Sequence, residues 1–452
     1  MLGSVTRLTP RLGSFPDALT AFRAARFQTC LAKLNGIDSV PAATLRARTF
    51  LRLGDPRAAR ASLQADAAME HRDRSEVALL LGVAHSRLGD RSESDDAFRD
   101  AFVYSVSSLD VGLEAEVKYY KAAASFGEGD LAGGRAACLQ ALEIALAPAA
   151  FAKTGGNVPL DHVVSRIQEL LGAIAAAEGH YGEWLQYARA ALNTLDRCNT
   201  PDVFQEAFAV RNLTLLARDF DIADDARHLA GRVPSFAWTD DVCRVEFTTV
   251  EALGWCSALR GDVVGALRLF RRASAAASTE PEHVYVAVDR ALVAREFGHR
   301  AMALEETEHA LNIADRYDWN KAPGDYRLAL LVLAQAAASL TPVRARETLD
   351  RYTGIRNSMD ATFAARIEPR ARAEEAYTHG LVLRAEGRLT VSKERLQFAF
   401  ETWEAIGFKW RAARAALELA ELDAGELFRR AVRREVIQRP DSVFSARARL
   451  VA

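Results

Sequence analysis

The pattern of apolar and polar positions along the chain is that of amphipathic helices joined in pairs. Between residues 76 and 88, apolar side chains recur at the spacing of one α-helical face. Gly89 and Asp90 follow. Gly adopts a positive φ at little cost and Asp caps a helix N-terminus, so this dipeptide ends one helix and begins another. Residues 91–106 are again apolar at helical spacing, which predicts a unit of helix, tight turn and helix.

The same unit recurs along nearly the whole chain. The strings LGVAHSRLGD (81–90), LGAIAAAEGH (171–180) and LGWCSALRGD (253–262) share one frame. Runs typical of β-strands are nearly absent. A spacing of about 41 residues between helix stops predicts an all-α fold, an α-solenoid of about eleven hairpins over residues 16–439. The predicted stops are Gly54, Gly89, Gly129, Gly179, 219–221, Gly261, Gly298, 341–342, Gly387 and Gly425.

The side chains within the unit resemble the tetratricopeptide repeat. In that family a small residue of the first helix lies where the second helix crosses it, and a large apolar residue fills the next gap. The period here is longer than the family's, and the Trp and Pro of its strict consensus are mostly missing. The resemblance implies a non-catalytic scaffold whose first helices line a concave groove for a protein or peptide segment. The positions that carry it are Leu253, Gly254, Gly261, Ala266, Phe270 and Ala273.

A second resemblance concerns residues 395–422, which look like the last repeats in the sensor arms of LuxR-type and AfsR-type bacterial regulators. Lys accounts for only seven of the 58 basic residues, which is typical of a high-GC bacterial genome. The sequence contains no P-loop motif, and no helix-turn-helix follows residue 422. We therefore expect a role in bacterial regulation or signalling without a nucleotide-hydrolysing or DNA-reading domain.

Several irregular stretches interrupt the array. The segments 147–163 and 356–372 are rich in loop-forming residues or break the repeat, and each is a candidate subdomain boundary. Residues 1–15 and 440–452 are expected to be loose tails.

Composition changes this picture little. The chain is 50% hydrophobic and 26% charged, with a formal net charge of −2, so it has no overall attraction for nucleic acid or an anionic membrane. Its five Cys include no CxxC pair, which argues against a disulfide framework and a zinc site. The N-terminus lacks the pattern of a secretory signal, and the longest apolar run is shorter than a membrane span. We expect a cytoplasmic protein.

Residues that would carry chemistry are scattered. No HExxH, GxSxG or dinucleotide fingerprint preceded by a strand occurs. The acidic cluster with His309 lies on a predicted helix, where a solvated charged face is the ordinary interpretation. The sequence predicts no catalytic residue, no cofactor and no metal ion, and hence no enzyme.

The repeat register assigns a candidate partner-binding groove. Aromatic residues mixed with Arg are typical of interface hot spots. Trp255 and Tyr119 fit equally well as packing between repeats, and the charged members fit as plain surface. The predicted groove residues are Glu116, Tyr119, Phe126, Arg166, Glu169, Glu251, Trp255, Tyr285, Arg295, Glu374, Tyr377 and Arg384.

The most basic stretch lies at residues 427–452. It is a candidate nucleic-acid patch, although a polar cap on the last helix is the favoured interpretation. Its core residues are Arg429, Arg430, Arg433 and Arg434.

Three functions therefore stand side by side. The first is a protein- or peptide-binding scaffold, the second a transcription-linked regulator that contacts nucleic acid through the Arg-rich end, and the third a sensor of a peptide or small molecule. Whether the chain forms homo-oligomers stays open.

Overall fold

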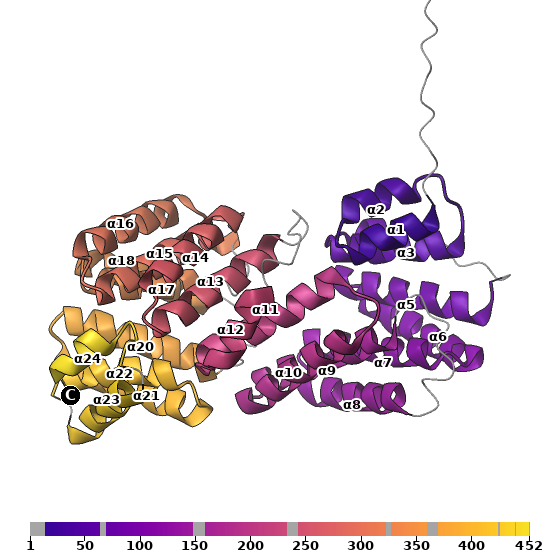
Figure 1. Ribbon diagram of the computed structural model, residues 1–452. Helices are drawn as coiled ribbons and strands as arrows, with labels where there is room; N and C mark the ends of the chain where they lie inside the picture. Colours follow the sequence, from indigo (N-terminus) through magenta and orange to yellow (C-terminus); the bar gives the residue numbers. More distant parts are fainter. Residues whose placement is uncertain are drawn as a thin grey trace, which may run out of the picture. The chain divides into compact units, whose positions relative to one another are not determined.

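The computed structural model describes residues 14–63, 69–147, 159–232, 243–321, 327–358, 369–423, 425–438 and 440–451. Every regular element within these ranges is helical. Figure 1 shows the helices following one another in antiparallel pairs. Eleven such pairs occur in the described residues, which confirms the predicted all-α array of about eleven hairpins.

The chain divides into two compact units, which we call unit 1 and unit 2. Of the described residues, unit 1 contains 14–174 and 189–206, and unit 2 contains 175–188 and 207–451. The helices that begin in unit 1 are α1 (Phe15–Arg23), α2 (Phe27–Leu34), α3 (Val40–Arg52), α4 (Pro56–Ala61), α5 (His71–Leu88), α6 (Arg91–Ser108), α7 (Val111–Gly127), α8 (Leu131–Leu146), α9 (Leu160–Ala177) and α11 (Val203–Asp219).

Unit 2 holds the remaining hairpins and a short final helix. The boundaries between the units fall inside α9, α10 and α11 and not at the expected breaks 147–163 and 356–372, whose central residues lie outside the described ranges. The helices are α10 (Tyr181–Arg197), α12 (Ala223–Arg232), α13 (Cys243–Leu259), α14 (Val263–Ala276), α15 (Glu280–Glu296), α16 (Arg300–Arg316), the 3-10 turn η4 (Trp319–Lys321), α17 (Leu328–Ala338), α18 (Pro342–Ser358), α20 (Pro369–Ala385), α21 (Leu389–Ile406), α22 (Lys409–Glu421), α23 (Glu426–Gln438) and α24 (Ser445–Val451).

The hairpin turns lie where the sequence predicts them. Gly89 adopts φ +84° and ends α5, and Gly261 adopts φ +80° between α13 and α14. Asp262 then caps α14, where its Oδ1 accepts a hydrogen bond from the Gly265 amide at 2.8 Å. Positive φ also occurs at the other predicted stops except 341–342, namely at Gly54, Gly129, Gly179, Asp221, Gly298, Gly387 and Gly425.

The small residue of the first helix permits close packing within a hairpin. A Cβ atom on Gly254 of α13 would lie 2.5 Å from the Phe270 ring of α14. A Cβ on Gly82 would lie 2.8 Å from the Phe98 ring in the hairpin of α5 and α6. Since real Cβ atoms do not approach this closely, both positions require Gly, and the repeat pattern predicts a small residue there.

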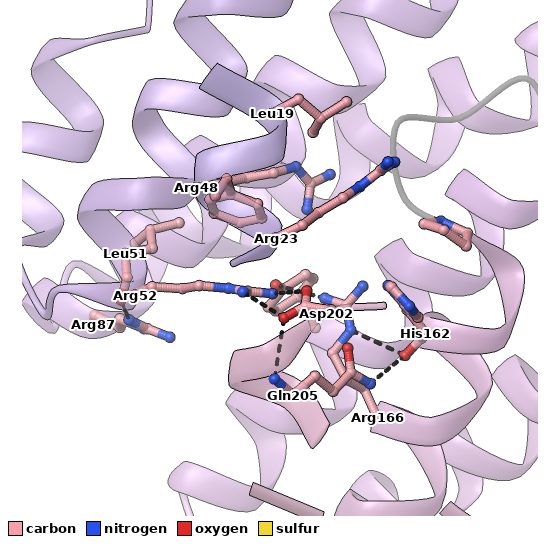
Figure 2. A pocket seen from close by; sticks show the side chains of 13 residues that line it. Leu19, Arg23, Arg48, Leu51, Arg52, Arg87, His162, Arg166, Asp202 and Gln205 are labelled. Carbon is pink, nitrogen blue, oxygen red and sulfur yellow. Dashed lines mark hydrogen bonds and ion pairs between the residues drawn. The ribbon is translucent and has the colours of Figure 1, made fainter. Parts of the chain in front are cut away.

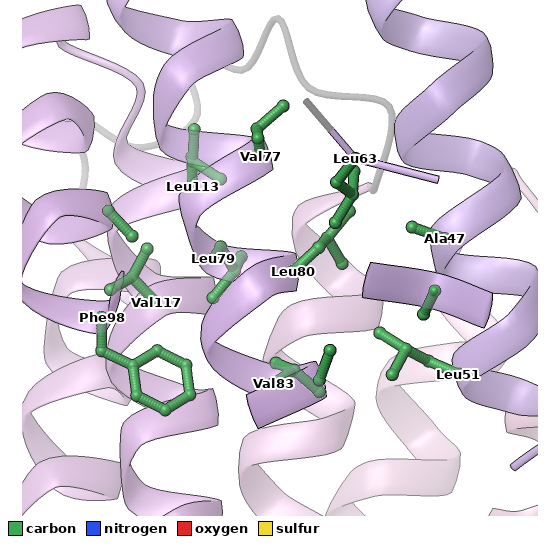
Figure 3. Packing of buried hydrophobic residues seen from close by; sticks show 13 residues of the cluster. Ala47, Leu51, Leu63, Val77, Leu79, Leu80, Val83, Phe98, Leu113 and Val117 are labelled. Carbon is green, nitrogen blue, oxygen red and sulfur yellow. The ribbon is translucent and has the colours of Figure 1, made fainter. Parts of the chain in front are cut away.

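The apolar stripes of successive hairpins form continuous cores. Figure 3 shows one in unit 1, where side chains from α3, α5, α6 and α7 interdigitate. Leu79 and Leu80 at its centre are fully buried. Packing between neighbouring hairpins therefore stabilises the array.

The C-terminal stretch differs from the expected loose tail. Residues 441–451 turn back onto unit 2, with Val443, Phe444 and Ala448 buried and α24 formed over 445–451. The cause is an apolar residue cluster in a stretch that composition alone marks as basic and polar. Residues 1–13 and 452 lie outside the described ranges.

Candidate partner-binding sites

A pocket in unit 1 is lined by five arginines that come from four different helices. Figure 2 shows their guanidinium groups around one space of about 580 Å³, which includes its open mouth. The arginines are Arg23 on α1, Arg48 and Arg52 on α3, Arg87 on α5 and Arg166 on α9, and the remaining wall is Leu19, Phe22, Leu51, Tyr120, Pro159, His162, Asp202 and Gln205.

Two of these arginines are held by buried carboxylates. Both terminal nitrogens of Arg48 donate to Glu116 at 2.8 and 2.9 Å, and its Nε donates to Glu76 at 3.1 Å. Arg166 contacts Glu116 at 3.1 Å and donates to the Tyr120 hydroxyl at 3.1 Å. Burial alone would raise the pKa of Glu116, but Arg48 and Arg166 lower that pKa to about 2. The cluster is therefore fully ionised at neutral pH and fixes both guanidinium groups.

A third arginine is held by Asp202, the residue just before α11. Arg52 donates to both carboxylate oxygens of Asp202 at 2.9 and 2.6 Å, and its guanidinium lies 4.2 Å from the centre of the Phe22 ring. Asp202 also accepts from the Gln205 amide at 3.1 Å, as an N-cap does. Burial would raise the pKa of Asp202, but Arg52 lowers it, so the pair is charged.

The remaining two arginines leave the pocket with excess positive charge. Glu76, Glu116 and Asp202 provide three negative charges against the five arginines, so the balance is about +2. Arg87 donates to the Leu51 carbonyl, and no ion pair joins Arg23 or Arg87 to an acidic residue of the described chain. A pocket of this charge favours a ligand group with two negative charges.

Neutral groups in the wall add directed hydrogen bonding. Nε2 of His162 lies 2.7 Å from the Thr200 carbonyl, so Nε2 carries the proton. Burial lowers the pKa of His162, which keeps the ring neutral. Gln205 donates to the His162 carbonyl at 2.8 Å, while its Oε1 has no partner among the described residues. The pocket thus offers a buried acceptor beside its cationic groups.

The first two predicted groove residues of unit 2 belong to a buried polar network. Glu251 on α13 accepts from Arg218 at 3.2 Å, and Trp255 donates to Asp289 of α15 at 2.9 Å. Burial and Glu251 raise the pKa of Asp289 well above its ordinary value. Trp255 is only 5% exposed, so this part of the predicted groove is interior in the structure.

A second part of the predicted groove, on α20, is also buried. Glu374 pairs with Arg411 of α22 and accepts from Gln335 of α17 at 2.7 Å. The Arg414 guanidinium lies 4.9 Å from the centre of the Tyr377 ring. Tyr377 and Glu374 therefore connect three hairpins of unit 2.

An acidic cluster lies between α15 and α22, next to two further predicted groove residues, Arg295 and Arg384. Arg295 donates to Glu296 at 2.8 Å, and Arg384 pairs with Glu418 at 2.5 Å and Glu421 at 2.9 Å. Three carboxylates thus face two arginines. The third cation is Arg447 of α24, which reaches Glu418 at 2.8 Å, Glu421 at 2.5 Å and Glu296 at 3.5 Å.

Taken together, none of the twelve predicted groove residues is freely exposed. Glu116 and Arg166 meet at the pocket of unit 1, where Tyr119 lies 5.6 Å from the Arg166 guanidinium. Their role in partner binding stays a prediction. The buried members are Glu116, Glu251, Trp255, Glu374 and Tyr377, and the half-buried members are Tyr119, Phe126, Arg166, Glu169, Tyr285, Arg295 and Arg384.

The sequence did not predict a binding role for the pocket arginines outside the twelve predicted groove residues. Arg23, Arg48, Arg52 and Arg87 lie on three different repeats, and the repeat register gives no reason to select them. The signal that the sequence does contain is the separation along the chain of oppositely charged residues that form ion pairs between hairpins. Arg218 and Glu251 are 33 positions apart, and Arg384 and Glu418 are 34 apart, and each pair joins the first helices of two successive hairpins.

The candidate basic patch is largely neutralised by acidic side chains of unit 2. Arg429 pairs with Asp423, Arg433 and Arg430 pair with Glu426, and Arg434 pairs with Glu404 at 3.0 Å. Its four arginines lie on α23 and are partly exposed. This arrangement fits a polar cap on the last hairpin.

Searches of known proteins return structural similarity only. No family model and no curated protein matches the sequence. An IFIT1 monomeric mutant with Gppp-AAAA is 13% identical, with 97% of this chain and 96% of that chain covered and a TM-score of 0.34. The P58(IPK) TPR domain is 12% identical with 88% and 96% covered and a TM-score of 0.27. The Cut9–Hcn1 hetero-tetramer of APC/C is 12% identical with 96% of each chain covered and a TM-score of 0.26.

These scores are too low to support an argument about ligands. The tetratricopeptide-like architecture rests on the hairpins themselves, with their positive-φ turn glycines and small crossing residues. In the described residues no His, Cys, Asp and Glu side chains group as a metal site would need. No described helix has the length and apolar character needed to cross a membrane.

Proposed function

We propose that the chain is a non-catalytic scaffold that binds an acidic segment of a partner protein in the arginine-lined pocket of unit 1. The observation that carries the proposal is the convergence of five guanidinium groups on one open pocket with an excess charge of about +2. Arg48, Arg52 and Arg166 are pre-positioned by ion pairs, so little side-chain entropy is lost on binding.

A peptide segment fits the neutral wall as well as the charge. The partnerless Oε1 of Gln205 can accept a backbone N–H, and Leu19 and Phe22 offer apolar contact beside the arginines. A regulatory or signalling role in a bacterial cytoplasm is the setting that we propose for this scaffold. It is supported by the Arg-rich composition and by the resemblance of residues 395–422 to bacterial regulator arms.

The second candidate is a sensor of a small dianion, which the excess charge of about +2 in the pocket favours. Both candidate functions bind a group with negative charges. They differ in whether this group belongs to a protein segment or to a free small molecule. A labelled hexaglutamate peptide represents the protein segment, and inorganic phosphate and citrate represent free small anions.

The test is a titration of the full chain with these probes, with affinity read by fluorescence anisotropy and calorimetry. We expect saturable peptide binding that Arg23→Glu weakens at least tenfold. Arg99→Glu is the matched control, since Arg99 is an exposed arginine of the same unit outside the pocket, and it should change the affinity less than twofold.

Each outcome decides between the two candidates. Tight binding of phosphate or citrate that is lost in Arg23→Glu, without peptide binding, would favour the sensor over the scaffold. Absence of binding by every probe, or equal loss in Arg99→Glu, would refute the pocket as an anion site.

A further inference from the structure

The segment 441–450 lies on unit 2 in the manner of a bound peptide. Its backbone contacts the turn between α13 and α14, where the Val443 amide donates to the Ala258 carbonyl at 3.1 Å. Ala258 is in the last turn of α13, and its carbonyl also accepts from the Gly261 amide at 3.0 Å, so the turn and the segment share one acceptor. A Cβ on Gly261 would lie 2.1 Å from the Asp441 carbonyl oxygen, so this turn is shaped to admit a passing main chain.

An aromatic side chain anchors the segment. The Phe444 ring stacks on Trp410 of α22 with centroids 6.2 Å apart and planes 10° apart. Trp410 in turn stacks on Trp255 of α13 at 5.6 Å. The Arg414 guanidinium lies 5.7 Å from the centre of the Phe444 ring. Phe444 is 8% exposed, so it occupies a site made by residues about 30 to 190 positions earlier in the chain.

A cation anchors the other end. Without Arg447, the carboxylates of Glu296, Glu418 and Glu421 face only Arg295 and Arg384, which leaves one uncompensated negative charge. Arg447 restores neutrality through contacts with all three carboxylates. Burial would raise the pKa of Glu418, but Arg447 and Arg384 lower it, so the cluster is ionised and requires a cationic partner.

The segment has little capacity to hold this conformation alone. Helix α24 has seven residues, which is below the length at which an isolated helix persists in water. Its other side is exposed, with Leu450 86% exposed. The order of the segment therefore comes from the surface beneath it, as for a peptide that folds on binding.

We propose that this surface of unit 2 is a second partner-binding site, occupied in the free protein by its own segment 441–450 as an intramolecular ligand. The partner that displaces it carries an aromatic residue three positions before an arginine, the spacing of Phe444 and Arg447. The aromatic residue fills the place beside Trp410, and the arginine binds Glu296, Glu418 and Glu421. This proposal is independent of the pocket in unit 1.

The decisive experiment uses the full chain and a fluorescent peptide with the sequence of residues 440–452. Tethering gives the internal segment an effective concentration in the millimolar range, so the unaltered chain should bind the peptide weakly. The double variant Phe444→Ala/Arg447→Ala weakens the internal segment and leaves the surface intact. We expect it to bind the peptide at least 100-fold more tightly than the unaltered chain does.

Matched controls come from the same segment. Arg449→Ala/Leu450→Ala alters two exposed residues of α24 and should leave peptide binding as weak as in the unaltered chain. A peptide that carries Arg447→Glu should not bind the Phe444→Ala/Arg447→Ala variant, since it would place a fourth carboxylate in the acidic cluster.

Hydrogen exchange of the unaltered chain gives a second readout that needs no variant. Millimolar peptide should accelerate exchange of residues 441–450 without accelerating exchange in α13, α15 and α22. No saturable binding to a folded double variant would overturn the proposal. So would a general rise in exchange across unit 2, because the segment would then be part of its core. A dimer that dissociates on Phe444→Ala/Arg447→Ala would show that the occupant is a second copy and would also overturn it.

Discussion

At the scale of single residues, the charged positions of the first helices act as connections between hairpins. Arg48 of α3 reaches Glu76 of α5 and Glu116 of α7, and Glu374 of α20 reaches Arg411 of α22. Breaking a buried ion pair leaves a charge without compensation, so each such pair is costly to disrupt. These pairs fix which hairpin faces can lie next to each other.

The pH dependence of Glu116 follows from this burial. Its pKa falls from 4.5 to about 2 in the folded chain. Its contribution to the free energy of unfolding is therefore fully present above pH 4.5 and is lost as the pH falls toward 2. We expect Glu116→Gln to lower the free energy of unfolding of unit 1 by about 3–5 kcal/mol at pH 7. The difference from the unaltered chain should shrink between pH 4.5 and pH 2, as measured by urea unfolding.

Glu114→Gln on the same helix is the control, since no described residue forms an ion pair with Glu114. It should change the free energy of unfolding by less than about 0.5 kcal/mol at every pH. A Glu116→Gln difference that stays constant down to pH 2 would contradict the assignment.

At the scale of elements, one glycine decides how closely two helices of a hairpin approach. Gly254 brings α13 against the Phe270 ring, whereas a Cβ on Gly354 of α18 would meet no atom of another described element within 4 Å. Both are helical, so both have the same intrinsic cost relative to Ala. Only their surroundings differ.

The two glycines should therefore respond to the same substitution with opposite sign. We expect Gly254→Ala to lower the free energy of unfolding of unit 2 by about 1–3 kcal/mol through overpacking. Gly354→Ala should raise it by up to about 1 kcal/mol through helix propensity. Thermal and urea unfolding measure both. Addition of Phe270→Leu should recover part of the Gly254→Ala loss, and two variants that shift stability in the same direction would argue against the close contact.

At the scale of the whole molecule, arginine is abundant but mostly matched by acid. The net charge is −2, and each arginine of the candidate basic patch has an acidic neighbour. Nucleic-acid binding depends on cations that are free to displace counterions. This balance favours the protein-binding function over the nucleic-acid alternative.

We therefore expect weak, non-specific binding of nucleic acid at most. The full chain should bind a labelled 30-base-pair duplex with a Kd weaker than about 100 μM at 150 mM salt. Arg430→Glu/Arg434→Glu should change that value less than twofold. Tight binding that weakens steeply with salt and disappears in this variant would restore the regulator that contacts nucleic acid.

The sequence predicted the scaffold far better than the sites. The turn glycines and the small residue at 254 are local signals, since their conformation depends on the chain immediately around them. To predict the groove one must know which surface stays exposed, and this depends on residues far away in the sequence that pack on it. Trp255 is covered because Trp410 stacks on it, and Phe444 stacks on Trp410 in turn. Replacing it with Ala should destabilise unit 2, and it is therefore a poor probe of partner binding alone.

The docked C-terminal segment has a consequence for synthesis of the chain. Phe444 emerges from the ribosome about 20 residues after Glu421, the last residue of the surface that it covers, an interval of roughly 1 to 5 s at ordinary elongation rates. During that time the tryptophan surface and the acidic cluster exist only without their internal ligand. A nascent chain is thus open at this surface before the finished protein closes it, so a partner made nearby has its earliest access during translation.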